Sequence, residues 1–154
     1  MVTAIKKYFD HYIKPSPDNS EDVSAHSLRL ATTALLVEMM KADTSVNDEE
    51  RRAVVKTIQS QFHLTAEETD GLLRVAEEEI RKATGYFEFT SLINKGLSYE
   101  QKVKVIEHLW EIAFSDSRLD KHEEHMVRKI AGLIYVEHKD FIEAKLRVKK
   151  KLGL

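Results

Sequence analysis

Four oxygen-bearing side chains lie around one bend in the stretch "EMMKADTSVNDEE", and together they could bind a hard divalent cation. Glu38 lies five residues before Asp43, and Asn47 and Glu50 follow a short polar break. In a helix that ends near Ala42, Glu38 and Asp43 can face the same bend, and Glu50 can approach it from the next helix. Carboxylate and amide oxygens suit Ca²⁺ or Mg²⁺ better than Zn²⁺. These four residues are therefore a candidate metal site.

The same pattern occurs a second time, 73 residues further along the chain. The shift places Glu38 on Glu111, and the stretch "EIAFSDSRLDKHEE" then follows the spacing of the first. The match continues as far as Phe62, which falls on Tyr135. The candidate ligands of the second copy are Glu111, Asp116, Asp120 and Glu123. Two helix–acidic loop–helix units share one pattern, which predicts an internal repeat.

Part of this pattern has a structural explanation. Asn47 and Asp120 stand where helix N-caps are expected, and Glu50 and Glu123, three residues later, can reach back to them. Capping does not explain Glu38, which interrupts the apolar stretch "ALLVEMM", or its equivalent in the second copy. An ionised carboxylate in apolar surroundings is costly unless it is paired, so both acids need partners.

Three interpretations of the acidic loops remain open at this point. The acids could accept backbone N–H bonds within their own turns and pair with Lys, Arg or His of a facing helix, which would make them purely structural. At least one loop could bind a divalent ion, although the ligand spacing is not that of an EF-hand. The loops could also dock a basic partner without any metal.

The elements that position these loops are expected to be helices. The chain of 154 residues is 42% apolar and 32% charged, with only five glycines and two prolines, which favours helix and a single domain. Apolar residues at helical spacing predict an all-α bundle of about seven to eight helices. We expect an N-terminal helix and proline-containing linker in residues 1–20, and a helical domain in residues 21–154 with repeat units at about 27–80 and 100–148.

Several local signals predict where individual helices lie. The most apolar helix, between residues 22 and 42, is expected at the centre of the core. Capping boxes predict helix starts at Thr65 and Ser98, and Gly96 suits the C′ position at the end of a short helix.

Charge and composition exclude several classes of function. The net charge is −2, so no overall positive field would attract nucleic acid. The absence of cysteine excludes thiolate nucleophiles and cysteine-based zinc sites, and it is usual for a cytosolic protein. No stretch has the length and apolar character of a transmembrane segment or a signal peptide, so we expect a soluble, cytoplasmic protein.

Other groups with chemical potential lie outside the repeated pattern. His122 and His125, with His108 one helix earlier, suggest zinc, but no further ligand can be placed, which favours exposed histidines. No nucleophile elbow, P-loop or dinucleotide-binding pattern occurs, so we predict neither catalytic nor cofactor-binding residues. The basic tail "AKLRVKKKLGL" is either a solvated helix end or a contact for anionic lipid or an acidic partner.

The two acidic stretches resemble the TerB-like tellurite-resistance family, whose fold also occurs as the N-terminal domain of a membrane-anchored DnaJ-type co-chaperone. The resemblance extends over residues 25–148 and departs from the family at Thr44 and Ser117, where members typically have glycine. It implies a bundle of two packed halves with pseudo-twofold symmetry, and no enzymatic reaction. The family's acidic positions correspond to Glu38, Asp43, Glu50, Glu111, Asp116 and Glu123.

The resemblance implies a non-enzymatic stress-response module that docks a protein partner near membrane-associated assemblies and can sense a divalent metal. Such a module would act in the cytoplasm, including the inner face of the membrane. Two alternatives remain: a metal enzyme that uses Glu38 and Glu111 as paired carboxylates, and a plain scaffold whose acids only cap helices and balance cations.

Overall fold

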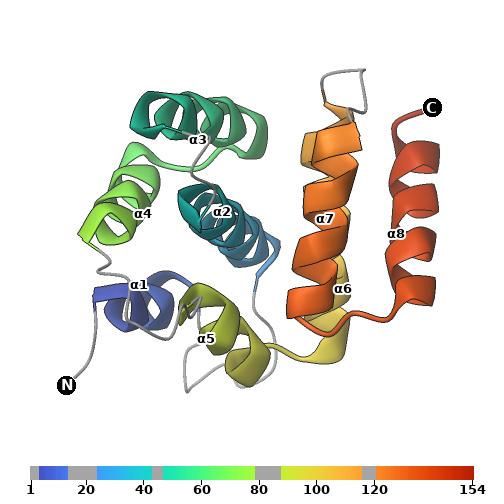
Figure 1. Cartoon of the computed structure of the whole chain (residues 1–154), viewed down its shortest axis with the longest axis horizontal. Coiled ribbons are helices and arrows are strands. Elements are labelled where there is room, and N and C mark those ends of the chain that lie inside the picture. The colour runs from blue at the N-terminus through green and yellow to red at the C-terminus, as the bar shows by residue number, and fades with distance from the viewer. Residues whose placement is uncertain (1–3, 14–23, 43–46, 79–87, 116–120) are drawn as a thin grey trace. The chain divides into compact units, whose positions relative to one another are not determined.

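The computed structural model describes residues 4–13, 24–42, 47–78, 88–115 and 121–154, without the side chains of residues 42, 76–78 and 121–123. All regular secondary structure in these ranges is helical, which confirms the predicted all-α fold. The predicted linker and the boundary at residue 20 lie outside the described ranges. The helices are α1 Ala4–Tyr12, α2 Ala25–Ala42, α3 Asp48–Phe62, α4 Ala66–Glu78, α5 Glu88–Gly96, α6 Tyr99–Phe114, α7 Lys121–Leu133 and α8 His138–Lys151 (Figure 1).

The chain forms two compact units. Met1–Gly96 contains α1 to α5, and Leu97–Leu154 contains α6 to α8. The predicted copies of the helix–loop–helix pattern therefore lie one in each unit, as α2–α3 and as α6–α7. The two loops, at residues 43–46 and 116–120, lie outside the described ranges, so the internal repeat stays a prediction.

The first unit is built around α2, as the apolar sequence of this helix predicts. α2 contacts α3, α4 and α5, while α1 contacts α4 and α5. Every residue from Leu30 to Met40 is buried. The buried hydroxyls of Thr32 and Thr33 donate to the backbone carbonyls of Leu28 and Arg29, at 2.7 and 2.9 Å. Glu38, the remaining polar side chain of this stretch, must likewise have its partner inside the protein.

The second unit is centred on Trp110 of α6, which is fully buried. Its ring centroid lies 5.6 Å from that of Phe114 and 5.1 Å from that of Phe141, and its indole N–H donates to the Phe141 carbonyl at 3.3 Å. Aromatic contacts of this kind add to the stabilisation from burial alone. The cluster therefore holds α6 against α8.

The helix starts predicted at Asn47, Thr65 and Ser98 are confirmed, whereas the predicted cap at Asp120 lies outside the described ranges. The Asn47 side chain caps α3 by accepting the N–H three residues later, at 2.8 Å. Thr65 and Glu68 form a reciprocal capping box at the start of α4, with distances of 3.0 and 2.8 Å. Ser98 and Gln101 form another at the start of α6, with distances of 3.2 and 2.9 Å. These pairs involve residues three apart, which is why the sequence alone identifies them.

Gly96 has a different role from the C′ turn that its position suggested. It is the last residue of α5, and the only glycine with positive φ in the described ranges is Gly153. A Cβ atom at Gly96 would lie 2.9 Å from Cζ of Phe9. The glycine therefore allows the Phe9 ring of α1 to approach α5 closely.

Both α3 and α7 end in a left-handed residue that is not glycine. His63 has φ 57° and Tyr135 has φ 60°. The next residues, Leu64 and Val136, donate their N–H groups to carbonyls five residues earlier, at 3.0 and 2.9 Å. This is the Schellman arrangement, in which glycine usually occupies the left-handed position.

The predicted equivalence of Phe62 and Tyr135 is wrong. Phe62 is 2% exposed, whereas Tyr135 is 72% exposed. The left-handed residues His63 and Tyr135 are 72 positions apart instead of 73. The second helix of the second predicted copy therefore ends one residue earlier than a shift of 73 residues would place it. Backbone hydrogen bonding and burial determine where a helix ends, and the acidic pattern does not specify them.

Candidate functional site

Four of the eight predicted site residues have described side chains: Glu38, Asn47, Glu50 and Glu111. The remaining four, which are Asp43, Asp116, Asp120 and the side chain of Glu123, lie outside the described parts of the chain. These four residues lie in different local environments. Glu38 is buried in α2, Asn47 and Glu50 are exposed at the start of α3, and Glu111 is half-buried in α6.

Glu38 binds the N-terminus of α5. Its side chain is buried, and its carboxylate accepts three hydrogen bonds from the first turn of that helix. Oε2 accepts the backbone N–H of Phe89 at 2.7 Å, while Oε1 accepts the backbone N–H of Thr90 at 3.1 Å and the Thr90 hydroxyl at 2.9 Å. The first N–H groups of a helix have no partner within the helix and carry partial positive charge. They are therefore well suited to hold a buried carboxylate.

This contact joins segments that are 51 and 52 residues apart in sequence. Phe89 is itself 1% exposed, and its ring lies 6.1 Å from that of Tyr8 in an edge-to-face arrangement. Glu38 thus ties α2 to the same turn of α5 that packs against α1. The sequence correctly indicated that Glu38 needs a partner, and a basic side chain or a divalent ion were the candidates. The helix N-terminus was not among them, because no local pattern marks it as the partner of a distant acid.

Glu111 has the partners that the structural interpretation predicts. Nζ of Lys151, in α8, lies 3.3 Å from Oε1 of Glu111. Nδ1 of His108, which is in α6 like Glu111 itself, lies 3.5 Å from Oε2, an ion-pair distance. Interaction with His108 lowers the pKa of Glu111; partial burial acts in the opposite direction, and the charges of His108 and Lys151 lower it further. The acid is therefore held in its ionised form by cationic neighbours.

The two acids that the predicted repeat would make equivalent thus have different partners. Glu38 binds backbone N–H groups of a helix end, whereas Glu111 binds the side chains of Lys151 and His108. The similar sequences therefore serve different local contacts in the two units. Neither carboxylate is left exposed for a ligand in the way that the metal interpretation requires.

The first turn of α3 is the exposed acidic part of the predicted site. Asp48, Glu49 and Glu50 follow one another and are all exposed. Asp48 pairs with Arg51, whose side chain is 9% exposed. Acids at a helix N-terminus are stabilised by the helix dipole, so this charge is held at little cost. The turn directly follows the first acidic loop and presents carboxylates to solvent.

Within the described ranges, no group of three or more His, Asp or Glu side chains is arranged to hold a metal ion. His108, one of the histidines considered for zinc, lies beside Glu111, while His125 is exposed. The side chain of His122 lies outside the described part. The described residues therefore do not form a metal centre by themselves.

A second polar cluster, which sequence reasoning missed, joins α1, α2 and α4. Nε2 of His26 lies 2.9 and 2.8 Å from the two carboxylate oxygens of Glu68, and the Tyr8 hydroxyl donates to the Glu68 carbonyl at 2.6 Å. Burial acts to raise the pKa of Glu68, but the Thr65 N–H and His26 outweigh it and the pKa is lowered. Burial, and then the charge of Glu68, raise the pKa of Tyr8. The cluster is structural, since it fastens three helices together.

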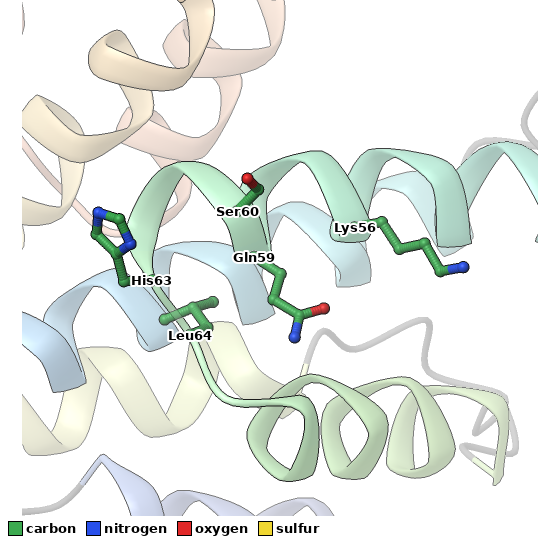
Figure 2. A pocket seen from close by; sticks show the side chains of 5 residues that line it. All are labelled: Lys56, Gln59, Ser60, His63 and Leu64. Carbon is green, nitrogen blue, oxygen red and sulfur yellow. The ribbon is translucent and has the colours of Figure 1, made fainter.

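An open surface hollow of about 600 Å³ lies at the end of α3 (Figure 2). Its lining consists of Lys56, Gln59, Ser60, His63 and Leu64. Figure 2 shows that the side chains of Lys56 and His63 point in different directions rather than toward a common point. The hollow therefore does not assemble a catalytic or ligand-binding group of side chains.

A family model described as "Tellurite resistance protein TerB" matches residues 29–146. This segment covers more than half of the chain and contains all eight predicted site residues. No curated protein and no solved structure matches the chain significantly. Among the helices that the structure describes, none has both the length and the apolar character needed to cross a membrane.

Proposed function

Because the chain belongs to the TerB family of tellurite resistance proteins, we propose that it is a non-enzymatic stress-response module that docks a protein partner through its two acidic loops. It acts in the cytoplasm, including the inner face of the membrane. A divalent cation, Ca²⁺ or Mg²⁺ rather than Zn²⁺, tunes this docking.

The observation that supports docking is the exposed acidic turn at the start of α3. Asp48, Glu49 and Glu50 directly follow the first loop and face solvent. Adjacent carboxylates on a surface favour a partner with a complementary basic patch and increase its rate of association. Nothing in this arrangement supplies a nucleophile or a general base beside a cleft, which is why the proposal contains no reaction.

The cation part of the proposal depends mainly on acids other than Glu38 and Glu111. Both of these already have partners within the protein. Glu50 has an exposed carboxylate next to the first loop, which suits a hard cation. The loop acids Asp43, Asp116, Asp120 and Glu123 are the other proposed ligands.

Isothermal titration calorimetry with Ca²⁺, Mg²⁺, Mn²⁺ and Zn²⁺ tests the cation part. We expect a dissociation constant below about 1 mM for Ca²⁺ or Mg²⁺, within the range of oxygen-ligand sites. The double variant Asp43→Asn with Glu50→Gln should lose the binding of the first loop. A matched control is Glu100→Gln, which removes an exposed acid from the first turn of α6. The cation part fails if wild type shows no binding tighter than about 1 mM.

Growth in tellurite tests the docking part separately. A tellurite-sensitive host that lacks its own TerB protein should regain resistance with wild type and with Glu100→Gln. It should lose resistance with Glu49→Gln and Glu50→Gln combined, at an unchanged protein level. Equal resistance for all three chains would refute docking through this turn, whatever the calorimetry shows.

A scaffold role is the second candidate, and the partners of Glu38 and Glu111 favour it. If the acids only stabilise the fold, loop variants will change the free energy of unfolding without changing tellurite resistance. The growth test therefore separates the two functions.

A further inference from the structure

The last turns of α8 and the residues that follow them contain both exposed leucines and lysines. Leu146 is 57% exposed, Leu152 is 46% exposed and Leu154 is 62% exposed. Only six large hydrophobic side chains are exposed in the described part of the chain, so half of them lie within these nine residues. Such a concentration of apolar surface marks a place of contact rather than ordinary scatter.

Leu146 lies on the side of α8 that faces away from its own unit. Phe141, Ala144 and Val148 form the buried side of the helix. The opposite side carries Leu146 and Lys150, both exposed and four residues apart, with Lys139 and Glu143 earlier on the same side. The chain then turns at Gly153, which has φ 73°, and leaves Leu152 and Leu154 exposed beyond the helix end.

The charge of this segment is opposite to that of the rest of the chain. Residues 138–154 contain six basic and two acidic residues, a net +4, so the other 137 residues carry −6 of the total of −2. Three of the basic residues are paired within the second unit: Lys145 with Glu124 at 3.0 Å, Arg147 with Glu107 at 2.7 Å, and Lys151 with Glu111 at 3.3 Å.

Lys149 and Lys150 have no ion pair within the described ranges, and they directly follow Val148 on the last turn of α8. Their charge is therefore uncompensated and lies next to the exposed leucines. The segment thus presents two lysines without ion pairs together with three exposed leucines.

We propose that the surface formed by Leu146, Lys149, Lys150, Leu152 and Leu154 binds an anionic lipid bilayer. The lysines contact the headgroups and the leucines enter the interface, as in peripheral amphipathic segments. Charge complementarity selects this occupant, because an anionic surface attracts the unpaired charges of Lys149 and Lys150 beside the exposed leucines. Nucleic acid would use the lysines and leave the leucines in water.

Co-sedimentation with vesicles tests this binding on the whole chain. At about 0.05 M NaCl, the chain should pellet with vesicles that contain about 30 mol% phosphatidylglycerol, and it should pellet far less with pure phosphatidylcholine. About 0.5 M NaCl should release it, because salt screens the attraction. No binding to anionic vesicles, or equal binding to both kinds, would overturn the proposal.

Matched lysine variants localise the contact. Lys149→Gln with Lys150→Gln should weaken binding about 30-fold, since each lysine near an anionic surface contributes about fivefold. Lys56→Gln with Lys95→Gln removes the same charge from exposed positions of the first unit and should change binding less than about twofold. Equal losses for the two pairs would show a non-specific charge effect and overturn the proposal. Helical circular dichroism should be unchanged in both.

Insertion can be measured directly because the chain contains no cysteine. An environment-sensitive dye at Leu146→Cys should shift to the blue on anionic vesicles, whereas the same dye at Lys56→Cys should not. A soluble acidic polypeptide, polyglutamate, serves as the competing partner. If polyglutamate binds the tail and vesicles do not, the occupant is an acidic protein and the lipid proposal is wrong. These variants leave the acidic loops intact, so the result is independent of the proposed docking function.

Discussion

Replacing Glu38 by glutamine should destabilise the first unit, because the new amide group cannot accept a hydrogen bond on both sides. Glutamine has nearly the same shape as glutamate, so the change tests hydrogen bonding and charge rather than packing. If its oxygen keeps the bonds to Thr90, its NH₂ group faces the N–H of Phe89, which lies 2.7 Å from the carboxylate oxygen in the wild type. Two donors then face each other in a buried place.

The magnitude follows from two costs. A buried N–H without an acceptor costs about 1–3 kcal/mol. The lost attraction between the carboxylate and the α5 N-terminus adds about 0.5–2 kcal/mol, and part of it is offset because no charge is buried any longer. We therefore expect Glu38→Gln to lower the free energy of unfolding by about 2–3 kcal/mol. At a few degrees per kcal/mol, the melting temperature should fall by roughly 4–10 °C.

Urea denaturation followed by two probes can locate the effect. Circular dichroism reports all helices, whereas the fluorescence of Trp110, the only tryptophan, reports the second unit. If the two units unfold separately, only the first transition should move. Glu111→Gln is the matched control, because it changes the equivalent acid of the second copy, which interacts with side chains instead of a helix end. A change of less than about 0.5 kcal/mol in Glu38→Gln would refute the reasoning.

Three further predictions concern other features of the two units. Tyr135→Gly should stabilise the second unit by about 0.5–1 kcal/mol in urea denaturation, because glycine relieves the left-handed conformation, and Tyr135→Ala should give no such gain. The folded protein lowers the pKa of Glu111, so the contribution of this carboxylate to stability is present above its unfolded pKa and is lost as the pH falls through the lower folded value. Glu111→Gln should therefore flatten the dependence of stability on pH in the acidic range. Gly96→Ala should lower the melting temperature, because the added Cβ would lie 2.9 Å from the Phe9 ring. Gly132→Ala should raise the melting temperature slightly, because no atom lies within 4 Å of the added Cβ and alanine favours helix. The opposite order of melting temperatures would contradict the packing.

Sequence patterns alone predict the helical class, the central position of α2 and several helix starts. The caps at Asn47, Thr65 and Ser98 could be predicted because each depends on groups only three residues away. The burial of α2 could be predicted because its apolar residues leave no polar face. The family could also be recognised from short acidic stretches. All of these are local properties of the chain.

The need for partners at Glu38 and Glu111 was likewise evident from their apolar neighbours, but the identity of the partners was not. The donors that bind Glu38 come from a helix more than fifty residues away, and one cation that binds Glu111 comes from the end of the chain. Gly96 suited a turn by its sequence, yet it serves to admit the ring of Phe9. Only the tertiary structure decides such contacts, because a sequence pattern specifies which groups must be satisfied, while chain packing determines which distant groups come close enough to satisfy them.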